Sequence, residues 1–321
     1  MGHEPVLLAP MLAALSPRPG ETLVDATFGG GGYARAILAA ADCRVIGIDR
    51  DPAAVARGRE LARENPRFRM VPGRFGDMPS ALRSIGVDRV DGIVLDLGVS
   101  SFQLDAAERG FSFRHDGPID MRMSSEGPSA ADLLMRCDEA ELATLFRRLG
   151  EEPEAGRVAK AIVERRATKR FARTADLAAV VASAKRRHKP GRDPATLVFQ
   201  ALRMAVNDEL GELERALEAS VDLLRPEGRL VVVAFHSAED RMVKRFVDRQ
   251  SGRDRAVSRH RPPREQVAPR MVWSVRKTVT ASAEEVQRNP RSRSARLRAA
   301  VRTDAGIGVD ENADDGWRAA A

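Results

Sequence analysis

The sequence predicts an α/β fold: a mostly parallel, Rossmann-like sheet that carries an inserted helical domain after its fourth strand. Three observations lead to this expectation. Short Val/Ile/Leu-rich runs alternate with helical segments up to residue 96, which is typical of a parallel sheet covered on both faces. A glycine-rich turn joins the first of these strands to the helix after it. The alternation then stops at Gly98 and resumes only near residue 205.

Four apolar runs account for the first half of the sheet. They lie at residues 22–27, 44–49, 68–71 and 90–96. Helices are expected at residues 6–15, 33–41, 52–65 and near residue 80. Pro52 suits the start of its helix, because the first turn does not use the N–H that proline lacks.

The second half of the chain is expected to complete the same domain. An amphipathic helix at residues 208–224 precedes an apolar strand at 228–235, an Arg/Pro-rich loop follows residue 250, and a short β-like run covers 270–275. The expected organisation is a domain built from residues 1–104 and 206–309, an inserted helical and basic domain at 105–205, and a disordered tail at 310–321.

Composition indicates a globular protein without a membrane span. The chain has 321 residues, of which 43% are hydrophobic and 31% charged. No apolar stretch approaches the ~20 residues that cross a bilayer, and the N-terminus shows no secretory signal. Cys43 and Cys137 are the two cysteines, and they form neither a disulfide framework nor a metal-site pattern. We therefore expect a cytoplasmic protein without a metal.

Positive charge is concentrated in two blocks of the chain. The formal net charge is +7 and the pI is about 10. Residues 156–192 hold 12 Lys/Arg against 2 Asp/Glu, and residues 241–302 hold 18 against 5. Because each neutralised phosphate releases counterions, these blocks indicate a polyphosphate partner. The alternative is arginine that decorates exposed helices.

A candidate cofactor site lies at residues 25–32 (DATFGGGG), between the first strand and its helix. Glycines there let a ligand approach the backbone at a helix start. Asp49 ends the second strand, where a carboxylate can accept both hydroxyls of a ribose. These features also satisfy the dinucleotide pattern, so they leave dehydrogenase and methyltransferase equally open.

Three further features favour a methyltransferase. Asp25 lies just before the glycines, where a carboxylate suits a cationic amino-acid group and repels a pyrophosphate. Asp96 puts a second acid beside the crevice, at the tip of the fourth strand. A large basic insertion suits a macromolecular substrate. The structural alternative is that the glycines make a tight turn and the aspartates cap helices.

The chain resembles one known family, the ribosomal RNA small subunit methyltransferase H family. Matching stretches run almost from end to end of the chain. They are residues 3–8 (HEPVLL), 25–32, 49–52 (DRDP), 96–105 (DLGVSSFQLD), 109–113 (RGFSF), 118–123 (PIDMRM), 159–163 (AKAIV), 199–207 (FQALRMAVN), 235–241 (FHSAEDR) and 289–298 (NPRSRSARLR).

The resemblance implies a class I methyltransferase fold and S-adenosyl-L-methionine as methyl donor. It implies methylation of the N4 amine of a cytosine in the decoding centre of 16S rRNA, in the small ribosomal subunit. Cofactor contacts are implied at Gly31, Gly32, Tyr33, Asp49, Phe75, Asp96 and Gln103.

Two positions depart from the family pattern, which usually has histidine at 33 and proline at 102. Tyr33 follows backbone-donating glycines, so a main-chain contact survives the change. With Phe102 in place of the usual proline, the direction of the neighbouring Gln103 side chain stays open.

Methylation of an exocyclic amine requires positioning and a hydrogen-bond acceptor, because the amine becomes positive as it reacts. The candidate acceptors are Asp96, Asp120, Ser100, Ser101 and a backbone carbonyl near Gly98. His236 follows the fifth strand, where it either orients the base or caps the next helix. Methylation at cytosine C5 is disfavoured, because neither cysteine is placed to add to the ring.

Contacts to RNA are expected from aromatic and arginine side chains. Phe111, Phe113 and Trp273 are candidate stacking platforms, with a role in the core as the alternative. Arg109, Arg114 and Arg122 are candidates to stack on or clamp the RNA, and residues 291–302 are expected to contact phosphate. The inserted domain is expected to present the RNA to the methyl donor.

Other functions stay open on these observations. They are an amino-methyltransferase of DNA, a non-catalytic RNA-binding assembly factor that keeps the cofactor site as a relic, and a dinucleotide-dependent dehydrogenase. The sequence does not decide between a monomer and a homodimer.

Overall fold

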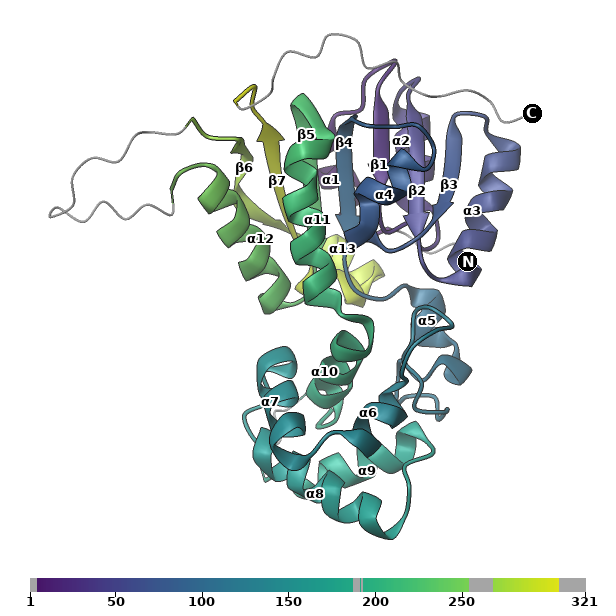
Figure 1. Cartoon of the computed structure of the whole chain (residues 1–321), viewed down its shortest axis with the longest axis vertical. Coiled ribbons are helices and arrows are strands. Elements are labelled where there is room, and N and C mark those ends of the chain that lie inside the picture. Colours follow the sequence, from purple (N-terminus) through teal and green to yellow (C-terminus); the bar gives the residue numbers. More distant parts are fainter. Residues whose placement is uncertain (1–4, 187–190, 192, 254–267, 306–321) are drawn as a thin grey trace, which may run out of the picture. The chain divides into compact units, whose positions relative to one another are not determined.

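The computed structural model describes residues 5–186, 191, 193–253 and 268–305. It divides into two compact units (Figure 1): Met1–Gly98 with Leu210–Ala321, and Val99–Glu209. The sequence placed the insertion at 105–205, a few residues inside the second unit. The tail expected to be disordered, 310–321, lies outside the described residues.

The first unit is built on a seven-stranded sheet in the order β3-β2-β1-β4-β5-β7-β6. Its strands are β1 Thr22–Asp25, β2 Arg44–Asp49, β3 Phe68–Pro72, β4 Val90–Asp96, β5 Leu224–Ala234, β6 Met271–Thr280 and β7 Arg296–Arg302. Strands β1 to β5 pair in parallel, whereas β7 is antiparallel to both β5 and β6. The predicted mostly parallel α/β sheet is therefore confirmed, and the helical insertion follows its fourth strand as expected.

Helices cover both faces of this sheet (Figure 1). They are α1 Leu8–Leu15, α2 Gly32–Ala40, α3 Pro52–Glu64, α4 Met78–Arg83, α11 Glu209–Leu223, α12 Ser237–Gln250 and α13 Ala283–Arg288, with short turns η1 Phe75–Asp77 and η3 Pro290–Ser294. On β5, Val231 and Val233 pack with α1 and α2, whereas Val232 packs with α11 and α12. This alternation explains why the strands read as continuous apolar runs, since both of their faces are buried.

The last strand differs from the sequence expectation. Residues 291–302 were expected to contact phosphate, but most of this stretch is β7, which lies inside the sheet. Arg298 binds the Asp240 carboxylate through Nε at 2.6 Å. Arg302 is 2% exposed, and its guanidinium donates to the carbonyls of Val221, Arg270, Thr303 and Ala305. The prediction is wrong for these two arginines, because they satisfy protein acceptors.

The second unit is helical. Its elements are α5 Ser101–Asp105, η2 Ala107–Arg109, α6 Ala130–Arg136, α7 Glu139–Gly150, α8 Ala155–Thr168, α9 Thr174–Ala184 and α10 Thr196–Asn207. Phe146, Ile162 and Leu202 are fully buried at its centre. Among the described residues of both units, none of the helices has the length and apolar character needed to cross a bilayer.

Aromatic side chains of the second unit belong to its core. Phe111 is buried, and Phe113 meets the ring of Phe199 edge-on with centroids 4.9 Å apart. Phe111 is therefore a core residue, and Phe113 is half-buried and packs against the core. In the first unit, Trp273 donates its indole N–H to Asp248 at 2.9 Å and lies beneath the guanidinium of Arg298.

Some basic side chains of residues 156–192 form contacts within the second unit. Lys185 and Glu152 form a buried ion pair at 2.7 Å. Arg173 pairs with Asp116, and Arg166 donates to the carbonyls ending α6. A count of lysine and arginine thus overstates the charge that this unit offers to a partner.

Candidate active site

The glycine loop between β1 and α2 takes a conformation that other residues disfavour. Gly29 and Gly31 have φ values of 52° and 76°, in the left-handed region. A Cβ on Gly31 would lie 2.6 Å from the ring of Phe28. The space that a side chain would need at Gly31 is thus taken by Phe28, so the tight turn before α2 requires glycine here; its role in binding a ligand stays a prediction.

The N-terminal segment packs against this loop. A Cβ on Gly32 would lie 2.3 Å from the side chain of Pro5. The Tyr33 hydroxyl donates to the carbonyl oxygen of Val6, and its ring is buried. Since the side chain of Tyr33 is part of the fold, its backbone is the part suited to contact a cofactor.

Asp49, at the end of β2, ties the glycine loop to the neighbouring strand. Its Oδ2 accepts from the N–H of Gly29 at 2.7 Å, and its Oδ1 accepts from the N–H of Asp51 at 2.9 Å. Burial raises its pKa above the usual carboxyl value. Each carboxylate oxygen has a second lone pair, so the group can still accept hydrogen bonds from a ligand.

Asp25 is buried at the end of β1. Its Oδ2 accepts from the N–H of Ala34 at 3.1 Å, and its Oδ1 from that of Thr27 at 3.4 Å. Burial, with the charge of Asp49 nearby, raises its pKa from 3.8 to about 7. Within the described residues this carboxyl forms no ion pair, and a cationic ligand would supply a positive partner.

Asp96 ends β4, which pairs with β1. Its Oδ1 is buried and has no hydrogen-bond partner within the described residues. Burial raises its pKa well above the usual value, and the charges of Asp25 and Glu239 add to this rise. An unsatisfied buried oxygen is costly, so this atom marks a place where a ligand atom is expected.

The turn that carries Phe75 is held by a residue that the sequence reasoning missed. Glu212 on α11 is fully buried, and its Oε2 accepts from the N–H of Gly76 at 2.8 Å. Its Oε1 binds Arg74 at 2.9 Å and Arg215 at 3.1 Å. The sequence signal that could have revealed Glu212 is its position on the apolar side of an amphipathic helix, on the same face as Ala216 and Ser220.

His236 occupies the N-cap position of α12, directly after β5. Glu239, three residues later and 2% exposed, accepts through Oε2 from the backbone N–H groups of Phe235 and His236. The capping alternative is therefore confirmed in position. The half-buried imidazole lies at the same carboxyl edge of the sheet as Asp96, so a role toward the base stays a prediction.

The remaining predicted site residues belong to the second unit. Ser100 and Gln103 form a capping box at α5: Ser100 Oγ accepts from the N–H of Gln103, and Gln103 Oε1 accepts from the N–H of Ser100. Ser101 Oγ is buried without a hydrogen-bond partner in the described part of the chain. The capping role explains the positions of Ser100 and Gln103.

Asp120 is bound by an arginine of its own loop. Both of its carboxylate oxygens accept from Arg122, at distances down to 2.6 Å. Despite partial burial, these hydrogen bonds lower its pKa. Arg109 is also committed, because it donates to the carbonyls of Arg122 and Met123. These contacts favour a structural role for Asp120 and Arg122, whereas Arg114 is exposed.

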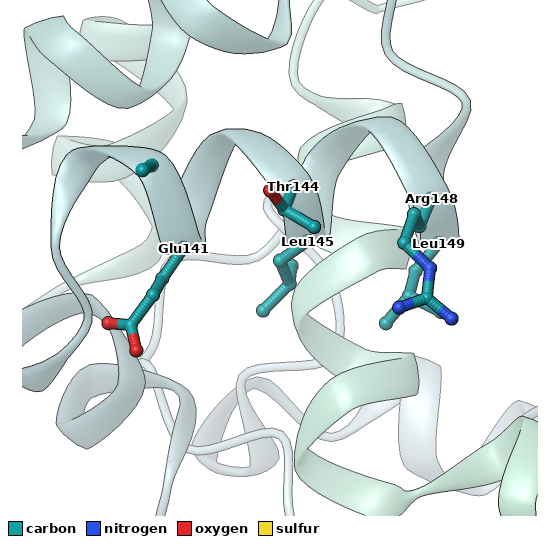
Figure 2. Close-up of a pocket in the computed structure, with 6 residues that line it drawn as sticks. Glu141, Thr144, Leu145, Arg148 and Leu149 are labelled. Carbon is teal, nitrogen blue, oxygen red and sulfur yellow. The ribbon is translucent and has the colours of Figure 1, made fainter.

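A separate pocket lies on α7 (Figure 2). It is lined by Ala140, Glu141, Thr144, Leu145, Arg148 and Leu149. All six belong to one helix and none is a predicted site residue, so this pocket does not contribute to the candidate active site.

The carboxyl edge of the sheet therefore fits a cationic, nucleoside-containing ligand. Asp25, Asp49 and Asp96 end three adjacent strands beside the glycine loop, and within the described residues the buried Oδ1 of Asp96 has no hydrogen-bond partner. A pyrophosphate would be repelled by these acids, whereas the ammonium and sulfonium groups of S-adenosylmethionine would be attracted. The fold and the site together define an S-adenosylmethionine-dependent methyltransferase.

Comparison with known proteins agrees with this class and narrows it. The chain belongs to the MraW methylase family, whose model matches residues 1–303. It is 56% identical over 306 residues to the ribosomal RNA small subunit methyltransferase H of Paramagnetospirillum magneticum, covering 94% of this chain and 96% of that protein. The protein of the same name from Hyphomonas neptunium is 52% identical over 315 residues, covering 98% and 92%.

Solved structures are more distant. An rRNA methylase from Streptococcus thermophilus aligns with a TM-score of 0.40 at 9% identity, covering 92% of this chain and 93% of that one. Such a score carries no argument about the present site.

Proposed function

We propose that this protein methylates the N4 amine of a cytosine in 16S rRNA of the small ribosomal subunit, in the cytoplasm. Relatives above 50% identity over almost the whole chain carry the name ribosomal RNA small subunit methyltransferase H. The observation that carries the proposal within the structure is Asp96 at the tip of β4, whose buried Oδ1 has no hydrogen-bond partner within the described residues.

Binding of the cofactor is assigned to the first unit. S-adenosylmethionine supplies an electrophilic methyl group on a positively charged sulfur. The backbone of Gly31, Gly32 and Tyr33 provides a surface that a ligand can approach closely. Asp49 accepts from ribose hydroxyls, and Phe75 provides an apolar surface. Asp25 offers negative charge to the amino-acid part.

Asp96 is assigned to the reacting amine. As the cytosine nitrogen bonds to the methyl carbon, the carbon–sulfur bond breaks and the sulfur would leave as a neutral thioether. The nitrogen becomes positive and passes one proton to the ionised carboxylate of Asp96. Asp96 accepts a hydrogen bond from this amine and stabilises the developing charge. A cation at this edge favours the ionised form of Asp96, against the effect of burial. His236 is assigned to the orientation of the base.

Ser100 and Asp120 are weaker candidates for this role, because a capping box and Arg122 already engage them. Gln103 stays a proposed contact of the cofactor on the strength of the family resemblance alone. The helical unit, predicted at residues 105–205, is assigned to recognition of the RNA.

The decisive experiment incubates the protein with small subunits that lack the modification and with labelled S-adenosylmethionine, followed by nucleoside mass spectrometry. We expect N4-methylcytidine, and its absence would overturn the proposal. Labelling of duplex DNA instead would support a DNA amino-methyltransferase. Failure to bind S-adenosylmethionine would support an assembly factor.

Two variants separate the roles of the site. Asp96→Asn should lower single-turnover rates by about 100-fold or more, within the range for removal of an electrostatic stabiliser. His236→Ala should lower turnover with little change in the Kd for S-adenosylmethionine. An unchanged single-turnover rate would remove the residue concerned from the mechanism.

A further inference from the structure

We propose that the exposed face of α12 binds the phosphate backbone of the RNA substrate. This face, the α12 cationic face, consists of Arg241, Lys244 and Arg245. The inference rests on the proposed function for the nature of the substrate. It assigns to the sheet-bearing unit an RNA-binding surface of its own, in addition to any surface of the helical unit.

Charges on α12 are sorted by sign between its two faces. The acids Glu239 and Asp240 are buried, at 2% and 5% exposure. Glu239 accepts from backbone N–H groups, and Asp240 binds Arg296 and Arg298. A third acid, Asp248, accepts from the indole of Trp273. The acids of the helix are thus committed inward, while its basic side chains are exposed.

Neighbouring acids do not cancel this charge in full. On α11, Glu218 pairs with Arg249 and Asp222 pairs with Arg270. Lys244 and Arg245 form no ion pair within the described residues, and Glu214 on α11 is a further exposed acid. On the adjacent edge strand β6, Arg276 and Lys277 are exposed and add positive charge.

The position of the helix connects this surface to the active site. α12 starts one residue after His236, at the edge where β4 also ends with Asp96. With a rise of 1.5 Å per residue, Arg241 lies about 6 Å and Arg245 about 12 Å along the helix from Ser237. Phosphates flanking a cytosine at this edge would therefore be within reach of the cationic face.

Helix α3 provides a contrast within the same unit. It packs beside β3, whereas α12 packs beside β6 at the other end of the sheet (Figure 1). Its exposed face carries Arg59 and Arg63, but also Glu60 and Glu64. Exposed arginine on α3 is thus mixed with acids, as on an ordinary solvated helix, whereas the exposed face of α12 carries a single sign.

A pair of charge reversals tests the proposal. Lys244→Glu/Arg245→Glu changes the α12 cationic face, and Arg59→Glu/Arg63→Glu makes the same change of charge on α3. For each variant we would measure the Kd for S-adenosylmethionine, the Kd for unmodified small subunits, and the kcat and KM for methylation. We expect the α12 variant to bind subunits at least tenfold more weakly, with an unchanged Kd for S-adenosylmethionine, while the α3 variant matches the wild type.

Salt dependence distinguishes phosphate contacts from contacts to a protein. Removing two phosphate contacts, as in Lys244→Gln/Arg245→Gln, should reduce the slope of log Kd against log salt by about 1.4 to 1.8. An unchanged slope, or equal losses in the α12 and α3 variants, would overturn the inference. Failure of the proposed function appears separately, as a wild-type protein that binds subunits but produces no N4-methylcytidine.

Discussion

Asp25 should make the stability of the protein and its affinity for the cofactor respond to pH in opposite directions. Its carboxyl is 1% exposed, and its pKa in the folded protein is raised from 3.8 to about 7. A raised pKa means that folding favours the protonated form. The folded state therefore loses stability as the pH rises from about 4 to about 7, by roughly 4 kcal/mol in total.

The perturbation is Asp25→Asn, which keeps the shape and one acceptor oxygen for the N–H of Ala34. The amide is neutral at every pH. Without cofactor, the variant should match the wild type only near pH 4, should be more stable by about 1–2 kcal/mol at pH 5, and should keep its full advantage above pH 7. The difference in the free energy of unfolding should reach a few kcal/mol, because the variant avoids the cost of burying an ionised carboxylate.

Cofactor binding should show the opposite trend, because a cation is attracted to the ionised carboxylate. The wild-type Kd for S-adenosylmethionine should rise about tenfold between pH 7 and pH 5.5, as Asp25 takes up its proton. Asp25→Asn should bind more weakly at pH 8, and its Kd should vary less with pH.

Chemical denaturation and isothermal titration calorimetry between pH 5 and pH 8.5 provide the two measurements. Asp42→Asn, at a side chain 85% exposed, is the control that removes a carboxylate outside the site. The reasoning would be refuted if the stability difference between wild type and Asp25→Asn did not change with pH, or if both proteins showed the same pH profile for binding.

Three further substitutions test other parts of the structure. Glu212→Gln should raise the KM for S-adenosylmethionine about tenfold with kcat largely retained, because the turn carrying Phe75 loses hydrogen bonds to a charged group worth roughly 1.5–3 kcal/mol. Steady-state kinetics with Glu218→Gln as control measure this effect. An unchanged KM would contradict it. Arg302→Met should lower the free energy of unfolding by roughly 3–5 kcal/mol, because it leaves buried carbonyls without a donor. Urea denaturation measures this loss, with the exposed Arg293→Met as control. An effect no larger than that of the control would count against the prediction. Gly31→Ala should lower the Tm and weaken cofactor binding, since the left-handed backbone alone costs roughly 1–2 kcal/mol; a wild-type Tm would show that the loop relaxes around the added methyl.

Much of the sheet was predictable because its signals are local. Strands β1, β2 and β4 are short apolar runs that end in aspartate, and both of their faces are buried. Strand β7 was not predicted, because its arginines read as a surface. Arg298 meets Asp240, 58 residues earlier in the chain, and Arg302 meets Val221, 81 residues earlier. Nothing in the local pattern indicates such partners.

Candidate site residues divide in the same way. Asp49 and the glycine loop follow from position, because parallel strands end at one edge and helices start there. Asp120 and Arg122 became weaker candidates because they form an ion pair with each other. Their spacing in the sequence did not indicate this pair. Glu212 entered the site through a contact 136 residues apart in sequence.

The α/β fold with its basic, helical insertion and its acidic strand tips is thus determined by the sequence itself, since periodicity and strand-end residues act over a few positions. Only the tertiary structure decides which charges are available for function. It buries Asp25 and the Oδ1 of Asp96, which form no ion pair within the described residues, and it satisfies Arg298, Arg302 and Lys185 internally. The physical reason is that the energy of a charge depends on burial and on partners, and both are set by contacts between distant parts of the chain.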